Sequence, residues 1–240
     1  ALTCVHNWMG TWTSTVDAYI ALTEFARQKY IEGGIPADKI RVKPNFVEYD
    51  PGEGRGQGRD ALYVCRLSVE KGLDTLLEAW ENIGSRLPLK IIGDGPLSDM
   101  VVQAAAKNSA IEWLGRQPMD TDYDFMGDAM VLVFPSKRYE TFGRVAIEAF
   151  AKGTPVVAAN IGAIAELIDT HKTGLLFEPG NSQSLIAKID WVLSHTQDVL
   201  SMRKQTREHY QRKFTASANH NILMDIYHQV SNRQSILAVK

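Results

Sequence analysis

The chain has 240 residues, which is long enough for one large domain or two modest ones. Its hydrophobic fraction of 45% and charged fraction of 22% are ordinary for a soluble globular protein. A net charge of −2 argues against a general nucleic-acid binder, and no apolar run approaches the ~20 residues that a membrane-spanning helix needs. Cys4 and Cys65 are too few for a disulfide framework or a zinc site, so we expect no bound metal and a cytoplasmic setting.

The first residues, ALTCVHNWMG, lack an initiator Met and the basic-then-apolar pattern of a signal peptide, and they are typical of a cut inside a longer protein. Residues 1–48 are predicted to form a separate fragment. Its expected elements are a helix near 1–15, a strand at 18–22, a helix at 24–32 and a short strand at 40–43.

Residues 49–60 are rich in glycine and polar, a composition typical of a flexible linker or an exposed loop. We place a domain boundary in this segment.

Residues 61–195 alternate short apolar runs with amphipathic stretches. The predicted strands are 61–65, 89–93, 111–115, 130–134, 155–159 and 174–178. The predicted helices are 72–84, 97–107, 118–127, 143–152, 162–168 and 181–194. This order predicts an α/β domain with a Rossmann-like parallel sheet and helices on both faces. Residues 196–240 add two further helices, near 196–212 and 215–230.

The segment from Pro135 to Asn160 carries the clearest functional signal. Glu140 is expected in a loop, 141–143 opens a helix, and Glu148 falls inside that helix. A helix that starts just after a parallel strand presents free N–H groups and the positive end of its dipole, both of which favour phosphate. Glu148 would lie ~7 Å along the helix axis, with the loop adding up to ~10 Å. The two carboxylates therefore suit the ends of an extended ligand such as a sugar nucleotide.

Three other loops follow predicted strands. Arg66 and Lys71 follow the strand at 61–65 and can present two cations to a phosphate, although solvated loop charges are an equally good interpretation. Gly93 begins a tight turn in which the backbone can approach a ligand closely. Arg116 and Gln117 either border a nucleotide base or belong to an ordinary strand-to-helix loop.

The segment at 162–166 is predicted to enter another helix. Glu166 is expected in its first turn, where its charge would complement the dipole of that helix.

These segments together resemble the C-terminal half of the family-4 retaining glycosyltransferases, which have two Rossmann-like domains facing across a cleft (the GT-B type). The resemblance covers nearly the whole chain. It is carried by residues 17–47, YVCRLSVEKGLDTLLEAW at 63–80, IIGDGP at 91–96, residues 134–167 and TGLLFEPGN at 173–181.

The resemblance implies a role for each candidate residue. Arg66 and Lys71 would hold the donor diphosphate and stabilise the leaving group, and Glu140 would contact hydroxyls of the donor sugar. Glu148 would bind the ribose, and residues 116–118 would border the base. The backbone that would hold the sugar and phosphate at the helix N-terminus belongs to Phe142, Gly143, Arg144 and Val145. No cofactor or bound metal is implied besides the nucleoside-diphosphate sugar.

The family has a complete N-terminal acceptor-binding domain before the part that corresponds to residues 1–48. We therefore expect the final helices to pack toward such a domain, to expose apolar surface or to recruit a partner chain. We also expect weak or no transferase activity from this polypeptide alone, with the donor site kept.

The expected function is transfer of sugar from a UDP-, GDP- or ADP-sugar to a glycan or lipid-linked acceptor, in the biosynthesis of a polysaccharide or glycolipid. Nucleic acid is not an expected partner, and membrane association of the full-length protein stays open. Two alternatives remain: a sugar-nucleotide-binding module without turnover, and a sugar-nucleotide epimerase on the same scaffold.

Overall fold

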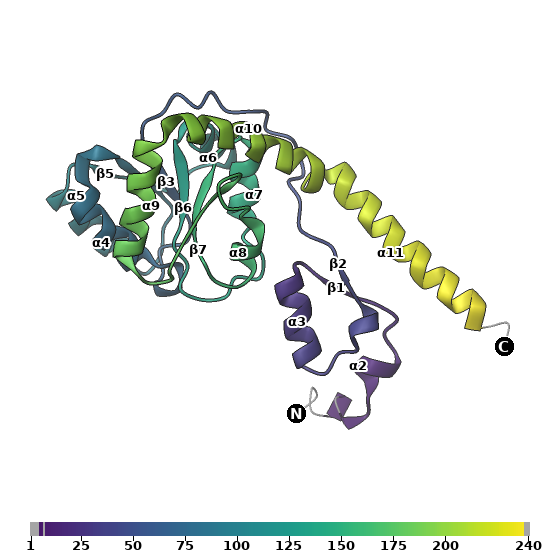
Figure 1. The fold of residues 1–240 in the computed structure, drawn as a ribbon. Helices are drawn as coiled ribbons and strands as arrows, with labels where there is room; N and C mark the ends of the chain where they lie inside the picture. Colours follow the sequence, from purple (N-terminus) through teal and green to yellow (C-terminus); the bar gives the residue numbers. More distant parts are fainter. Residues whose placement is uncertain (1–4, 7, 238–240) are drawn as a thin grey trace.

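The computed structural model describes residues 5–6 and 8–237, with side chains as far as residue 232. Figure 1 shows a small N-terminal unit, a larger unit built on a six-stranded sheet, and a C-terminal helix that runs back past the small unit. Part of the helix predicted near 1–15 lies outside the described residues. Its described part is broken by a turn at Met9 and Gly10, where the φ of Gly10 is +65°, before the short helix α2 (Thr11–Ser14). The prediction of a single helix there is therefore wrong.

The small unit is a βαβ arrangement. Strands β1 (Tyr19–Ala21) and β2 (Ile40–Val42) pair in parallel, and α3 (Glu24–Glu32) connects them with the 3-10 turn η1 (Ala37–Lys39). Helix α3 begins after Thr23 because the Thr23 hydroxyl accepts a hydrogen bond of 3.1 Å from the Ala26 N–H. The predicted strand, helix and strand are therefore confirmed in order and type.

The large unit contains a wholly parallel sheet with strand order β5-β4-β3-β6-β7-β8. Its strands are β3 (Ala61–Val64), β4 (Leu89–Ile92), β5 (Ile111–Gly115), β6 (Val131–Phe134), β7 (Val156–Ala159) and β8 (Gly174–Phe177). All six predicted strands are confirmed. The chain reverses its direction of winding between β3 and β6, so the loops after these two strands diverge and leave a crevice at the carboxyl edge.

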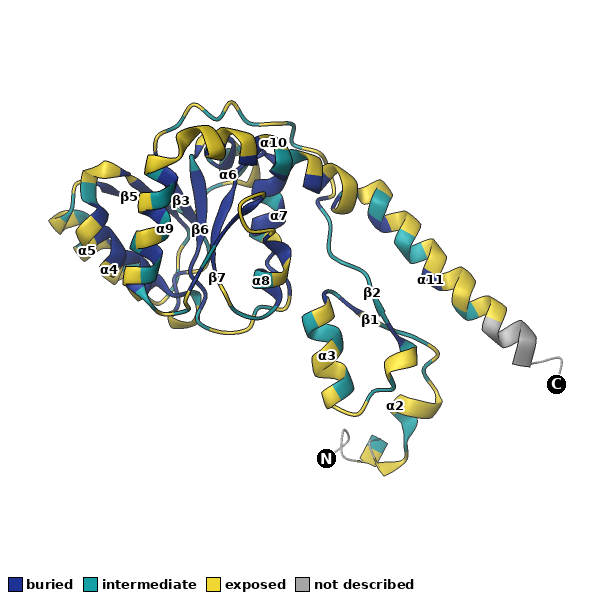
Figure 2. Cartoon of the chain, in the orientation of Figure 1, coloured by how far each residue is buried: buried dark blue, intermediate teal, exposed yellow. Residues whose placement is uncertain are grey.

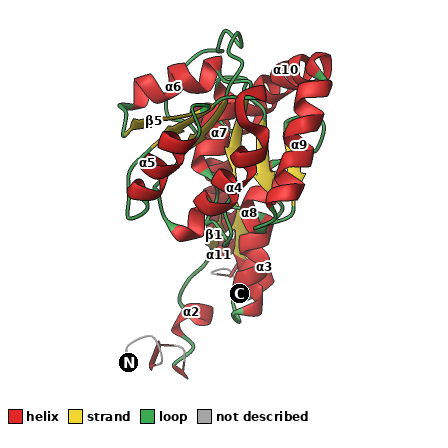
Figure 3. Cartoon of the chain, turned by 90° about the vertical axis from the view of Figure 1, so that its left-hand side faces the viewer, coloured by secondary structure: helices red, strands yellow, loops and turns green. Residues whose placement is uncertain are grey.

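Helices cover both faces of this sheet, as Figure 3 shows from the side. They are α4 (Leu73–Ile83), α5 (Ser98–Lys107), α6 (Met119–Asp128), α7 (Arg144–Ala151), α8 (Gly162–Leu167) and α9 (Ser182–Ser194), with short 3-10 turns η2 (Val69–Lys71) and η3 (Gly84–Arg86). Alternate strand residues belong to different cores: Tyr63 packs in the core that includes Trp80 and Ile189, whereas Leu62 packs in the core that includes Phe150. Figure 2 shows the resulting buried strands between half-exposed helices. The predicted α/β fold class is confirmed.

The glycine-rich segment is packed against the large unit, contrary to the expectation of a flexible linker. The N–H groups of Gly54, Gly56 and Gly58 donate hydrogen bonds of 2.9, 3.0 and 2.8 Å to the backbone carbonyls of Lys152, Gly127 and Asp128, at the C-terminal ends of α7 and α6. A Cβ at Gly54 would lie 2.1 Å from Gly127 Cα, and one at Gly58 would lie 2.1 Å from Asp128 O. Glycine at every second position therefore allows close backbone contact, while the residues between them stay exposed. The domain boundary within 49–60 stays a prediction.

The C-terminal helices α10 (Thr196–Lys213) and α11 (Ala216–Leu237) tie the two units together. The N–H of Val47 donates a 2.9 Å hydrogen bond to Phe214 O at the junction of these helices, and Lys43 Nζ donates one of 2.7 Å to Asn219 Oδ1. Arg207 forms a two-pronged pair with Asp50, at 2.8 and 2.6 Å. Helix α11 extends beyond the predicted end at 230 because residues 231–237 contain no Gly or Pro to stop it. None of the helices in the described part of the chain is long and apolar enough to cross a bilayer.

His209 makes the stability of the large unit depend on pH. Its ring packs 5.8 Å from Phe150 and 5.4 Å from Phe214, and burial, with Lys213 and Arg212 nearby, lowers the His209 pKa to about 4. The unfolded chain therefore binds an extra proton between pH 6.5 and 4. We expect about 2–3 kcal/mol of unfolding free energy to be lost as the pH falls through this window.

Urea denaturation at pH 7.5 and pH 5 checks this expectation. His209→Phe should reduce the difference between the two pH values, with His220→Phe as the exposed control. An equal pH dependence in wild type and His209→Phe would contradict it.

Gly93 sets how closely the loops after β3 and β4 approach. Its φ is +134°, and a Cβ there would lie 1.9 Å from Cys65 O. We expect Gly93→Ala to lower the free energy of unfolding by about 3 kcal/mol or more, because backbone strain adds to the clash. Gly34→Ala is the matched control, since Gly34 has a φ of +93° but nothing within 4 Å of its Cβ position. Equal losses in urea denaturation of the two variants would show that the contact with Cys65 is unimportant.

Candidate functional site

A cleft of about 780 Å³ opens at the carboxyl edge of the sheet, where the loops after β3, β4 and β5 meet helices α6 and α7. This volume lies within the range of small-molecule sites. Its lining residues are Val64, Cys65, Arg66, Ile92, Gly93, Asp94, Arg116, Gln117, Pro118, Met119, Asp122, Tyr123, Met126, Val145 and Glu148.

The cleft brings together six of the residues proposed from the sequence, contributed by four different segments of the chain: Arg66, Gly93, Arg116, Gln117, Val145 and Glu148. The other five do not line this cleft. Lys71 lines a small adjoining void that shares Val64 and Cys65 with it, Glu140 binds Lys71, and residues 142–144 open α7. The proposed residues thus lie in the cleft, beside the adjoining void or at the start of α7.

Glu148 projects from the second turn of α7 into the cleft. Its side chain is 13% exposed, and the Arg144 guanidinium donates a 2.9 Å hydrogen bond to Glu148 Oε1. Burial raises the pKa of Glu148, and the neighbouring Arg144 opposes that rise. Because Arg144 satisfies one oxygen, the carboxylate keeps acceptor capacity for a hydroxyl group in the cleft.

Lys71 and Glu140 form an ion pair beside the crevice between β3 and β6. Lys71 Nζ lies 2.6 and 2.8 Å from the two carboxylate oxygens of Glu140, and the Ser136 hydroxyl donates to Glu140 Oε1 at 2.5 Å. Burial alone would lower the pKa of Lys71, but the hydrogen bond and charge of Glu140 outweigh it, so the Lys71 pKa is raised. Gly72, with a φ of +70°, allows this approach because a Cβ there would lie 1.8 Å from Pro135 O.

The N-terminus of α7 lies between Gly143 and Arg144. The helix starts at Arg144, one residue after the predicted start, and no side chain caps it at Gly143, whose φ is +106°. Phe142 is buried and packs 6.3 Å from Phe214, so it anchors the helix start in the core. The first turn of an uncapped helix presents backbone N–H groups and a positive dipole end to an anion.

Asp122 and Tyr123 line the cleft but escaped the sequence reasoning. Asp122 Oδ1 is buried and has no hydrogen-bond partner among the described residues. Burial and the charge of Glu148 raise the pKa of Asp122 to about 6. The sequence places Asp122 and Tyr123 one turn after Pro118, at the carboxyl edge of the sheet, which could have indicated a site. Because α6 carries three other acidic residues, the sequence alone did not distinguish Asp122 from them.

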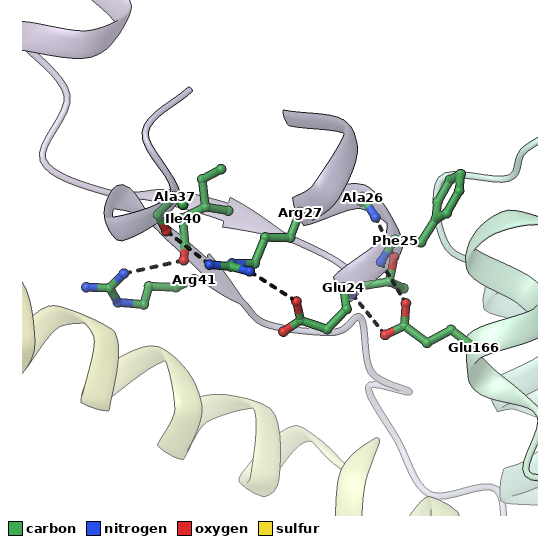
Figure 4. Close-up of polar contacts among 9 residues, drawn as sticks. Glu24, Phe25, Ala26, Arg27, Ala37, Ile40, Arg41 and Glu166 are labelled. Carbon is green, nitrogen blue, oxygen red and sulfur yellow. Dashed lines mark hydrogen bonds and ion pairs between the residues drawn. The ribbon is translucent and has the colours of Figure 1, made fainter. Parts of the chain in front are cut away.

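Glu166 differs from its prediction. It is the fifth residue of α8, beyond the first turn, and its carboxylate accepts hydrogen bonds from the N–H groups of Glu24 (2.9 Å) and Phe25 (2.8 Å). Figure 4 shows this carboxylate facing the start of α3. Its charge therefore complements the dipole of α3 in the small unit, and the expectation that it complements α8 was wrong.

Residues 5–6 and 8–237 contain no candidate metal-binding site. The structure places no three His, Cys, Asp or Glu side chains there in an arrangement that could hold an ion.

Comparison with solved structures relates this fold to several enzymes. A glycosyltransferase from Rickettsia africae superposes with a TM-score of 0.80 at 21% identity, over 93% of this chain and 67% of the other. The Anabaena protein HepE in complex with UDP gives a TM-score of 0.79 at 21% identity, over 90% of this chain and 64% of the other. At these identities the likeness concerns the fold.

Sequence relatives point the same way. An uncharacterized glycosyltransferase of Methanocaldococcus jannaschii is 32% identical over 179 residues, 74% of this chain and 50% of the relative. The glycogen synthase of Mycobacterium tuberculosis is 32% identical over 159 residues, 64% of this chain and 37% of that enzyme. The chain thus spans about half the length, or less, of these relatives.

The family model described as "Glycosyl transferases group 1" matches residues 50–209, which contain the six-stranded sheet and the whole cleft. The chain therefore belongs to the glycosyl transferases group 1 family and has the GT-B fold.

Proposed function

We propose that this chain is the donor-binding part of a retaining glycosyltransferase that uses a nucleoside-diphosphate sugar. One observation carries the proposal: Arg66, Glu148 and the loop at 116–118 line one cleft, and the uncapped N-terminus of α7 and the Lys71–Glu140 pair adjoin it. An elongated ligand with a base, a ribose, two phosphates and a sugar needs such a succession of groups.

The nucleoside would occupy the part of the cleft nearest α6. The loop at 116–118 would border the base, and Glu148 would accept hydrogen bonds from ribose hydroxyls. This orientation is supported by the burial of Glu148 and by Arg144, which holds one carboxylate oxygen and so fixes the direction of the other. Gly93 leaves room for the ligand because its backbone carries no side chain.

The diphosphate would lie between Arg66, Lys71 and the first turn of α7. The backbone of Phe142, Gly143 and Val145 would complete this anion site through its N–H groups. Lys71 now neutralises Glu140, so a bound diphosphate would compete with that carboxylate for the ammonium group. Glu140 would then contact hydroxyls of the transferred sugar.

Transfer would break the bond between the anomeric carbon and the phosphate oxygen and form a bond from that carbon to an acceptor hydroxyl oxygen, whose proton must leave. Negative charge develops on the departing diphosphate. Fixed cations and a helix N-terminus stabilise such charge because they need no rearrangement as it forms. We propose Arg66, Lys71 and α7 for this task, in a cytoplasmic enzyme acting on a glycan or a lipid-linked acceptor.

The proposal is tested by calorimetric titration with UDP, GDP and ADP, followed by their sugar conjugates. Saturable binding of one nucleotide and its conjugate is expected, and no binding to any of them would overturn the donor site. A second experiment adds the part of a relative's chain that this chain does not cover and assays sugar transfer to an acceptor. Transfer would indicate an enzyme, and binding without transfer would indicate a binding module. Conversion of the donor sugar to its epimer without acceptor would instead indicate an epimerase.

Glu148→Ala should weaken nucleotide binding by about 1–3 kcal/mol, since it removes the proposed acceptor for ribose hydroxyls. Isothermal titration with the nucleotide that the wild type binds measures the loss. Glu112→Ala, on a strand residue exposed outside the cleft, is the control. Unchanged affinity in Glu148→Ala would remove Glu148 from the site.

Arg66→Ala should weaken the nucleoside diphosphate far more than the nucleoside, by about 1.5–3 kcal/mol, because charged hydrogen bonds to phosphate are lost. Titration of both ligands gives the comparison. Equal losses for the two would mean that Arg66 acts through folding. Arg86→Ala, at an exposed pair with Asp190, is a control for the loss of charge.

A further inference from the structure

The small N-terminal unit touches the large unit beside the sugar end of the proposed donor site. Both oxygens of the Glu166 carboxylate are used in this contact, because they accept from the N–H groups of Glu24 and Phe25, 142 and 141 residues away in sequence. Thr23 caps the next free N–H, that of Ala26, at 3.1 Å. In the first turn of α3, the large unit therefore binds the N–H groups of Glu24 and Phe25, and the small unit binds that of Ala26 (Figure 4).

This contact is charge-assisted and directional. A carboxylate on the axis of a helix N-terminus gains from the helix dipole as well as from two hydrogen bonds. The Glu24 side chain, although it is acidic and next to the contact, is exposed and lies near Arg27 at 3.5 Å. The carboxylate that holds α3 against the large unit is thus Glu166.

The same helix turn reaches the loop that carries Glu140. The ring of Phe25 meets the ring of Tyr139 edge-on, at 4.8 Å between centroids and 61° between planes. Both rings pack over Gly162, where a Cβ would lie 2.9 Å from Tyr139 Cδ1 and 3.4 Å from Phe25 Cε1. Glycine at the start of α8 therefore makes room for the ring pair.

Tyr139 and Glu140 are consecutive, so the loop is held from two sides. Glu140 is bound on the site side by Lys71 and Ser136, and Tyr139 is bound on the outer side by Phe25. Tyr139 is 64% exposed, so apart from this ring contact little packing fixes the outer side of the loop. A shift of α3 would therefore pass through the ring pair to the residue next to Glu140.

We propose that Glu166 is a positioning residue: it docks α3 on the large unit so that the Phe25–Tyr139 pair fixes the Glu140 loop for the sugar of the donor. The inference rests on the proposed function, in which Glu140 contacts that sugar. It assigns the N-terminal unit a part in sugar recognition, separate from any part in holding the acceptor.

The proposal predicts a selective loss. Glu166→Gln keeps the size of the side chain but removes its charge and turns one acceptor into a donor that faces an N–H group. Phe25→Leu keeps an apolar side chain but removes the ring pair. In both variants, affinity for the sugar nucleotide should fall about three- to tenfold, the range expected from one aromatic pair, whereas affinity for the bare nucleoside diphosphate should stay within about twofold of wild type.

The experiment is isothermal titration of the whole chain with three pairs of probes: UDP and UDP-glucose, GDP and GDP-mannose, ADP and ADP-glucose. Glu24→Gln is the matched control, because it makes the same change of charge in the same helix turn without touching the contact. Circular dichroism of each variant shows whether it is folded, and Phe25→Leu keeps the test available should Glu166→Gln unfold.

An equal loss for nucleotide and sugar nucleotide, or no loss for either, would overturn the positioning role. Failure of the wild type to bind any of the six probes would overturn the proposed function, and with it this inference. Binding by the wild type with no selective loss in the variants would overturn the inference alone.

Discussion

The parallel alignment of all six strands in the large unit is the constraint on which the site depends. Because each strand enters the sheet in the same direction, the loops after β3, β4, β5 and β6 all emerge at one edge. Residues as far apart as Arg66 and Glu148 meet there without any direct pairing between their own segments. Two buried cores sandwich the sheet and stabilise it, and the loops at this edge can therefore hold polar groups that contribute little to packing.

Glycines at the same edge make the loops approach closely enough to form a site. Gly72 lies against Pro135 O and Gly93 against Cys65 O, each at a distance that excludes any side chain. The first contact brings Lys71 beside the loop of Glu140, and the second closes the floor of the cleft. The electrostatic consequence is a close Lys71–Glu140 ion pair, in which the carboxylate of Glu140 offsets the cost of partly burying the Lys71 ammonium group.

Backbone groups make several of the contacts that hold distant segments of the chain together. Glu166 binds two backbone N–H groups of α3, and the N–H of Val47 bonds to the junction of α10 and α11. The N–H groups of Gly54, Gly56 and Gly58 bind carbonyls at the C-terminal ends of α7 and α6. Such contacts specify geometry with little dependence on side-chain packing. Side-chain contacts complete the connection: Lys43 bonds to Asn219 of α11 and Asp50 to Arg207 of α10, and the Phe25–Tyr139 ring pair lies beside the Glu140 loop.

The sequence by itself determined the α/β alternation, the six strands, the start of α7 near Gly143, and six of the fifteen residues that line the cleft. These follow from local signals: apolar runs, glycine turns and the position of a residue just after a strand. Only the tertiary structure decided that the glycine-rich segment packs against the large unit and that Asp122 lies near Glu148. It also decided that the Glu166 carboxylate binds the N-terminus of α3 and not that of its own helix. Each of these features depends on which distant segment of the chain lies against the residue. For Glu166 that segment is 142 residues away. A local sequence pattern carries no information on which distant segments will be in contact.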